Sequence, residues 1–292
     1  MFIKRTPYFL LICITWILSG CNETFEPWQE NDQYHFSMFG YLDASADTQW
    51  VRIMPVREEL FLEPRPLDFI VTMEHAESGE SIVMQDSLFS YFQGYAWNFR
   101  SEMDIRPGQT YRITASHPDG RSSHTTVQLP EDFPTPILHT IPGGSSGGVE
   151  IYTRGIERIA DVRTIYTFEL PGAEGLHTRA FHHLKDTTRQ ASGEFVIRMD
   201  PREDTRALQA IGGPLFDGRM IADRRVFIAS AGPGFHPFPF LDENVTALPG
   251  GISNIENGTG YVAGIVSKTI PYESCFDENF QFIACDLLPP PW

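Results

Sequence analysis

Apolar and polar residues alternate with a period of two along most of the chain. Tyr111, Ile113 and Ala115 fall on one side of such a run, and the residues between them are polar. Neighbouring side chains of a strand point to opposite faces, so this pattern predicts half-buried strands. Similar runs cover residues 34–42, 50–56, 67–74, 81–85, 91–99 and 122–129.

Turn signals separate these runs. Pro107-Gly108 and Pro118-Asp119-Gly120 join a residue that presets φ to one that tolerates a positive φ. Roughly seven strands between residues 34 and 130 match an immunoglobulin-like β-sandwich in size. The Cys and Trp hallmarks of antibody domains are absent from the sequence.

The second half is also rich in predicted strands. Residues 130–136 contain three prolines and two acids, cannot continue a central strand, and are interpreted as a linker. We therefore expect an all-β chain with two β-sandwich-like domains, residues 34–130 and 131–292, and minor helix in the second. Strand-like runs follow at 149–152, 164–170, 194–199, 225–229 and 261–267, and helical patterns at 201–211 and 242–255.

The N-terminus has the three regions of a lipoprotein signal peptide. Lys4 and Arg5 precede an apolar stretch, residues 8–18, that is too short to span a bilayer comfortably. Leu18-Ser19-Gly20-Cys21 then matches a lipobox, which predicts a signal peptide over residues 1–20 and acylation of Cys21 by palmitate-type chains. Each buried methylene of such a chain contributes about 0.8 kcal/mol to membrane binding.

The polar, acidic residues 21–33 are interpreted as a tether between the lipid and the folded body. The expected location is the outer membrane, and both its periplasmic and its surface face remain open. The formal net charge of −16 argues against nucleic acid as a partner, because phosphates require Lys and Arg. No pattern calls for a cofactor.

Two of the four cysteines remain in the body after processing. Cys13 leaves with the signal peptide and Cys21 takes the lipid, so Cys275 and Cys285 form an even pair in an oxidising compartment. A disulfide between them would stabilise the C-terminal loop by about 2–3 kcal/mol. The alternative, a zinc site, needs two more soft ligands, and residues 274–292 contain no His.

Residues 253–262, S-N-I-E-N-G-T-G-Y-V, resemble the C-terminal signature of Bacteroidota envelope lipoproteins of the domain-of-unknown-function 4249 family. The usual form is close to S-N-I-x-N-G-x-G-Y/I-F; here Thr259 stands where Leu is common and Val262 where Phe is common. Residues 39–42, 51–56 and 105–113 are similar to the family's N-terminal strands. The resemblance implies a lipid anchor, β-sandwich architecture and TonB-dependent outer-membrane transporters as partners, but no established catalytic residues.

Catalytic patterns in the sequence lack the context that their chemistry needs. Residues 143–147 spell G-x-S-x-G, but a nucleophile elbow must open a helix, and a strand-like run follows instead. The acidic runs 200–204 and 242–243 lack the alternating ligand spacing of a calcium loop.

A histidine cluster could in principle bind zinc. His177, His182 and His183 lie near Asp186, and imidazole with carboxylate is a zinc ligand set. Adjacent residues on a strand point to opposite faces, so at most one of His182 and His183 can join His177. The alternative interpretation is a polar loop or edge strand.

The candidate binding loop consists of Phe235, His236, Phe238 and Phe240 together with Asn257 and Gly258. Aromatic rings in loops bind sugars or proteins when exposed and belong to the core when buried. For Asn257-Gly258 the alternative is a tight, left-handed approach to the last strand. We expect a non-enzymatic binding or accessory protein; the alternative is an envelope hydrolase of glycans or peptides with catalytic residues dispersed along the chain.

The lipobox predicts that Cys21→Ser leaves the protein unprocessed or soluble, because the thiol that receives the lipid is gone. Fractionation of cells into membrane and soluble parts measures this. If the variant still fractionates with membranes in a detergent-sensitive form, the lipobox interpretation is wrong.

The cysteine pair predicts that non-reducing mass mapping of the mature protein links the peptides of Cys275 and Cys285. Free thiols at both positions after periplasmic expression would refute the disulfide.

Overall fold

The computed structural model describes residues 34–56, 67–91, 94–141, 148–213, 220–235, 253–272, 275–276 and 282–283. All of them belong to the unit Tyr34–Trp292. None of the helices in these ranges is long and apolar enough to cross a membrane. The lipidation site Cys21, the tether, the G-x-S-x-G run, residues 242–252 and Cys285 lie outside the described residues, so the predictions made for them stay predictions.

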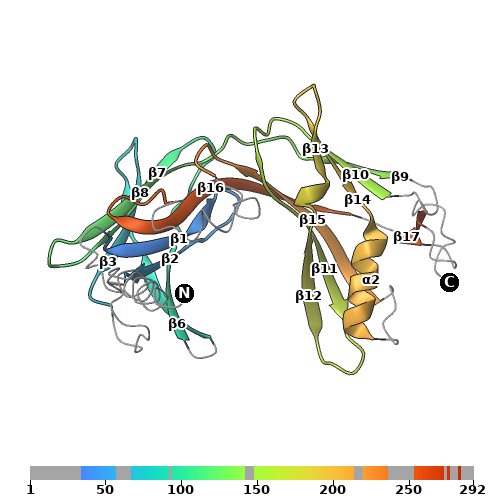
Figure 1. The fold of residues 1–292 in the computed structure, drawn as a ribbon, viewed down its shortest axis with the longest axis horizontal. Coiled ribbons are helices and arrows are strands. Elements are labelled where there is room, and N and C mark those ends of the chain that lie inside the picture. The colour runs from blue at the N-terminus through green and yellow to red at the C-terminus, as the bar shows by residue number, and fades with distance from the viewer. Residues whose placement is uncertain are drawn as a thin grey trace, which may run out of the picture. The chain divides into compact units, whose positions relative to one another are not determined.

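The fold is all-β, as predicted, and the first sandwich packs one sheet against part of a larger one (Figure 1). The four-stranded sheet has the order β4-β3-β7-β8, and the facing part of the large sheet has the order β1-β2-β6-β5. Tyr111, Ile113 and Ala115 are all buried on β7, in the phase that the alternation predicted. The strands are β1 (Phe36–Asp43), β2 (Gln49–Pro55), β3 (Ile70–His75), β4 (Ser81–Val83), β5 (Gln85–Tyr91), β6 (Gly94–Ser101), β7 (Thr110–Ser116) and β8 (Ser122–Gln128).

The second sandwich has its own hydrophobic core and carries the helix. Helix α2 (Pro201–Gly212) begins where the sequence predicted it, because the Asp200 side chain accepts a hydrogen bond from the Arg202 N–H and Pro201 stands at the first helical position. The remaining elements are β9 (Ile137–Ile141), β10 (Gly148–Thr153), β11 (Ile159–Glu169), β12 (Leu176–His182), η1 (Leu184–Asp186), β13 (Thr187–Arg189), β14 (Phe195–Met199), β15 (Ile221–Ala231), β16 (Gly258–Pro271), β17 (Cys275–Phe276) and β18 (Phe282–Ile283).

Strand β16 belongs to both sandwiches. Its first half pairs in parallel with β1 and its second half antiparallel with β15, and Ile265 has a partner in each. The result is one eight-stranded sheet of order β12-β11-β15-β16-β1-β2-β6-β5 (Figure 1). Val262 packs in the first core and Val266 in the second. The predicted domain division at 131 remains a prediction, but the structure adds that the two sandwiches share a sheet.

The segment that resembles the family signature fastens the start of β16 to the first sandwich. The Asn254 side chain pairs with the backbone of Val262, accepting from its N–H at 3.0 Å and donating to its carbonyl. Ser123 on β8 accepts from the Phe36 N–H and donates to the Asn257 carbonyl. Gly260 has φ +110°, and an added Cβ would lie 2.1 Å from the Met38 carbonyl oxygen. Only glycine fits there.

We therefore predict that Gly260→Ala lowers the free energy of unfolding by about 2–5 kcal/mol, through a strained φ together with overpacking against β1. Gly120→Ala is the matched control, since Gly120 also has a positive φ but has nothing within 4 Å of its added Cβ. That variant should lose only about 1–2 kcal/mol. Equal losses in denaturant titrations would contradict the close approach of β16 to β1.

Candidate functional site

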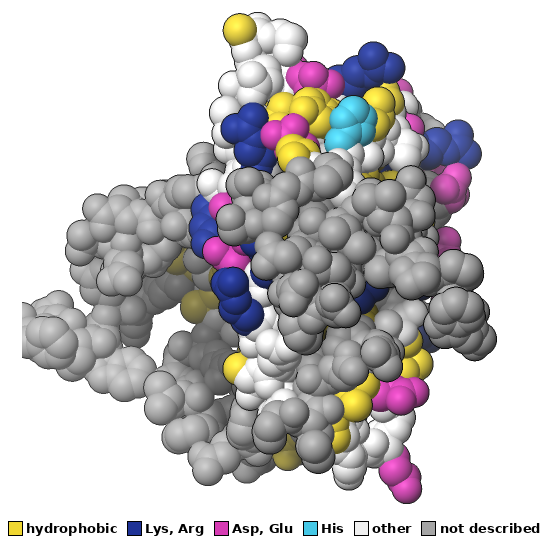
Figure 2. Space-filling model, turned by 90° about the vertical axis from the view of Figure 1, so that its right-hand side faces the viewer, with side chains coloured by type: hydrophobic (Ala, Val, Ile, Leu, Met, Phe, Trp, Pro, Cys, Tyr) yellow, Lys and Arg dark blue, Asp and Glu magenta, His cyan; other side chains and the backbone are white. Residues whose placement is uncertain are grey.

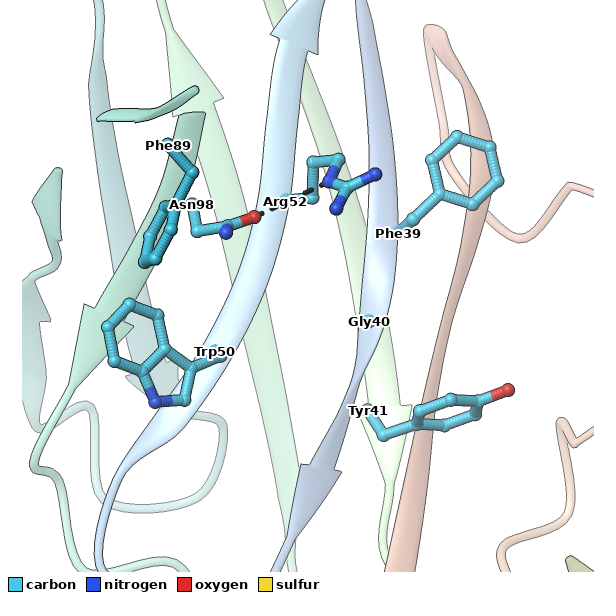
Figure 3. A pocket seen from close by; sticks show the side chains of 7 residues that line it. All are labelled: Phe39, Gly40, Tyr41, Trp50, Arg52, Phe89 and Asn98. Atoms are coloured by element: carbon cyan, nitrogen blue, oxygen red, sulfur yellow. Dashed lines mark hydrogen bonds between the residues drawn. The ribbon is translucent and has the colours of Figure 1, made fainter. Parts of the chain in front are cut away.

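An exposed aromatic surface lies on the first sandwich, on the outer side of the β1-β2-β6-β5 part of the large sheet. The side chains of Phe39, Tyr41, Trp50 and Phe89 are 46%, 42%, 41% and 47% exposed. With Gly40, Arg52 and Asn98 they line a shallow pocket of about 400 Å³ (Figure 3). We call these seven residues the aromatic face.

Strand register explains why these residues meet. Tyr41 on β1 lies opposite Trp50 on β2, and Phe39 lies opposite Arg52. Arg52 in turn lies opposite Asn98 on β6. The intervening residues, such as Met38 and Val51, are buried in the core, so the alternation turns the side chains of the aromatic face outward, while Gly40 stands in the inward phase.

The rings stand in two groups on either side of Gly40 (Figure 3). Trp50 and Phe89 meet edge to face, with ring centroids 6.1 Å apart and an interplanar angle of 76°. Phe39 and Tyr41 lie on the other side. Gly40 lies opposite the buried Val51 and so contributes only backbone to the floor, and the side chains of Arg52 and Asn98 lie between the two groups of rings (Figure 3). The pocket is therefore a shallow trough between aromatic walls.

The pKa of Tyr41 is raised above its ordinary value, first by burial of the phenol and then by the nearby carboxylate of Asp161. The hydroxyl therefore remains protonated at neutral pH and can donate a hydrogen bond.

The cations of this surface lack carboxylate partners. Arg52 donates to the Asn98 side-chain oxygen at 3.4 Å, and Arg100 donates to the Gln85 side-chain oxygen at 2.8 Å. Neither arginine forms an ion pair with a carboxylate in the part of the chain that the structure describes. Other arginines differ, since Arg198 pairs with Glu150 at 2.7 Å.

Charges of opposite sign are interspersed on other parts of the surface. On the face shown in Figure 2, Lys and Arg side chains lie among Asp and Glu side chains. The unpaired arginines of the first sandwich are thus a local positive feature of an acidic protein, whose formal net charge is −16.

The described residues of the candidate binding loop are divided between the core and a turn. Phe235 is only 4% exposed and packs between Tyr41 and Tyr261, so its ring is core, which is one of the two alternatives that the sequence left open. His236, Phe238 and Phe240 lie outside the described residues. Asn257, at φ 53°, and the buried Gly258 form the tight turn into β16, which is the structural alternative.

The histidine cluster is divided between two surroundings. His182 is exposed and lies 3.0 Å from Asp161, whereas His183 is buried, as their alternation predicted. His177 stands on β12 and stacks near Phe168. Within the described ranges, no three His, Cys, Asp or Glu residues are placed to hold a metal ion.

A buried polar network joins α2 to β11. One Asp204 carboxylate oxygen accepts from the Thr164 hydroxyl at 2.6 Å and from the Tyr166 hydroxyl at 2.9 Å. The same oxygen lies 3.2 Å from Nε2 of His183, whose Nδ1 lies 3.2 Å from Asp186. Sequence reasoning considered His183 and Asp186 together but Asp204 only as part of the acidic run 200–204, because no pattern shows that the helix turns this acid inward.

The network contains a hydroxyl, an imidazole and a carboxylate in the order used by nucleophilic enzymes. Thr164 lies 3.1 Å from Nε2 of His183. However, Thr164 is 1% exposed and its hydroxyl already donates to Asp204, so a substrate has no approach to it. The network is best explained as the fastening of α2 to the sheet.

The exposure of the aromatic face predicts that its rings add little to stability. Trp50→Ala should change the free energy of unfolding by no more than about 1 kcal/mol, most of it from the edge-to-face contact with Phe89. Trp97→Ala, at a position only 3% exposed, should cost about 3–5 kcal/mol. Similar losses in both variants on chemical denaturation would show that Trp50 serves the core.

The buried network predicts a pH dependence. Burial alone lowers the pKa of His183, but the carboxylates of Asp204 and Asp186 outweigh it and leave the pKa raised. The resulting stability is full below the unfolded-state pKa, about 6.5, and is lost as pH rises through the folded-state pKa.

In His183→Gln this loss of stability above neutral pH should disappear from denaturant titrations repeated across pH. His117→Gln provides the comparison with a histidine at the surface. There, hydrogen bonds from the imidazole to Asp68 and then to Asp119 raise the pKa of His117. An unchanged pH profile in His183→Gln would contradict the assignment.

No protein-family model matches the sequence, and no curated protein matches it. Among solved structures, the chain is similar to pullulanase from Anoxybacillus sp. LM18-11, free and complexed with maltotriose, at 9% identity and a TM-score of 0.24. This likeness covers 66% of the chain and 24% of the pullulanase, so the chain spans about a quarter of that protein's length. The FN1–FN3 domains of chicken CNTN1 are similar at 10% identity and a TM-score of 0.25, over 67% of this chain and 57% of that one. Likenesses at such TM-scores carry no argument, and the all-β assignment rests on the strands themselves.

Proposed function

We propose that this chain is a non-enzymatic binding protein of the outer membrane, anchored by a lipid on Cys21, that uses the aromatic face as its binding surface and assists a TonB-dependent transporter. The observation that carries the proposal is the exposure of Phe39, Tyr41, Trp50 and Phe89 together on one sheet. Contiguous apolar patches on soluble surfaces mark sites of interaction.

The scaffold beneath the aromatic face supports a binding role. Its side chains come from β1, β2, β5 and β6, whose backbone groups pair with neighbouring strands across the sheet. Sites built on strands hold their geometry better than sites on loops, which reduces the entropy lost on binding. Trp and Arg, both present here, are the residues that most often dominate binding energy.

The anchor and the transporter partner come from the sequence. The lipobox and the acidic residues 21–33 support a folded body that is held near the membrane by a tether. The resemblance of residues 253–262 to envelope lipoproteins associated with TonB-dependent transport suggests the partner. The aromatic face is then the part of the body available to a ligand that the transporter handles.

Affinity purification of the lipidated protein from native membranes tests this role. We expect a TonB-dependent transporter to co-purify with the wild type and not with Cys21→Ser, which lacks the anchor. Recovery of the wild type as a monomer without partners, together with turnover of a glycan or peptide, would contradict the proposal and favour the hydrolase alternative.

A further inference from the structure

We infer that the aromatic face binds an acidic glycan, one whose sugar rings carry carboxylates. This inference rests on the proposed function and names the class of ligand for the same surface. It depends on three properties of the face: aromatic walls, unpaired guanidinium groups, and the absence of free backbone groups within the sheet.

The walls suit a sugar ring. The faces of aromatic rings carry partial negative charge, and the C–H bonds on the flat side of a sugar ring carry partial positive charge, so the two attract each other. Trp50 and Phe89 on one side and Phe39 and Tyr41 on the other offer such surfaces on either side of the Arg52 and Asn98 side chains (Figure 3). The volume of about 400 Å³ falls within the range of roughly 300–1,000 Å³ found for small-molecule sites.

The polar groups exclude a purely apolar occupant. Arg52 and Asn98 lie inside the pocket, and their one mutual hydrogen bond, at 3.4 Å, is long. An occupant without polar groups would remove water from these donors and give nothing in return. Sugar hydroxyls can accept from the guanidinium and exchange hydrogen bonds with the amide.

Charge selects an acidic sugar over a neutral one. Arg52 is the only charged residue among the seven that line the pocket. Arg100 stands beside Trp50 in the next cross-strand row, and its partner is the neutral Gln85. A carboxylate can bind a guanidinium through two parallel hydrogen bonds. Asp161, whose carboxylate contributes to the raised pKa of Tyr41, already has a partner, because its Oδ1 lies 3.0 Å from Nδ1 of His182.

An extended peptide fits the surface less well. A peptide that adds to a sheet uses the free backbone groups of an edge strand. The pocket instead lies over β1, β2 and β6, which have neighbours on both sides, and reaches only Phe89 on the edge strand β5. Recognition on this face therefore goes through side chains.

The test is titration calorimetry of the full lipidated chain in detergent with oligomers of galacturonate, glucuronate and mannuronate, and with the same oligomers after their carboxyl groups are reduced to alcohols. We expect at least one acidic oligomer to bind, and its reduced form to bind at least tenfold more weakly. Trp50→Ala should weaken binding of the acidic oligomer at least tenfold.

Arg52→Gln should bring the acidic oligomer's affinity down to that of the reduced form. Arg189→Gln, at an exposed arginine on β13, is the matched control and should bind as the wild type does.

The outcomes separate this inference from the proposed function. Two results would overturn the inference of an acidic glycan and still leave the face as a binding surface. The first is equal binding of acidic and reduced oligomers. The second is no binding of any oligomer, while the wild type captures a membrane protein that Trp50→Ala does not capture. If Trp50→Ala alters neither oligomer binding nor capture from native membranes, the proposed use of the face fails as well.

Discussion

Strand β16 must find backbone hydrogen-bond partners along a length that no single sandwich provides. Its first half lies beside β1 and its second half beside β15, and Ile265 is the residue at which the partners change. At the crossing, Gly232 and Gly264 pack so closely on Gln128 that an added Cβ would lie 2.3 Å and 2.7 Å from its carbonyl oxygen. A side chain at either position would separate the end of β8 from the shared sheet.

The shared sheet also determines what faces solvent. β1 lies between β16 and β2, and β2 lies between β1 and β6, so most of the aromatic face stands on strands with a neighbour on each side, and only Phe89 stands on the edge strand β5. Met38, Leu42, Val51 and Ile53 hold these strands from the inside. The outward residues are thus free to differ in chemistry without loss of the core, and here they are aromatic rings and unpaired arginines.

Local patterns in the sequence predicted the strands but not how they combine. Alternation located β7 and β8 closely, and the helical pattern at 201–211 located α2, because these patterns depend on neighbouring residues. The parallel pairing of β1 with β16 joins segments more than 200 residues apart, and no local pattern encodes it.

The aromatic face was missed for a related reason. Phe39, Tyr41 and Trp50 are apolar letters that sequence reasoning counts toward a core, whereas the register turns them outward. A pattern in the sequence could have indicated them. Apolar residues occupy both alternating sets of positions on β1, although Met38 and Leu42 already supply the set that faces the core. For Phe235 the sequence left both an exposed and a buried ring open, and the structure buries it beside Tyr261.

Occupancy of the aromatic face in its natural setting is the central claim, and oxidative footprinting by hydroxyl radicals measures it directly on intact cells. The account predicts that Trp50 and Phe89 are oxidised several-fold more slowly in the cell envelope than in the purified protein, while the exposed Leu176 on β12 reacts equally in both. Equal oxidation of Trp50 and Phe89 in the two settings would mean that nothing covers this face, and would contradict the account.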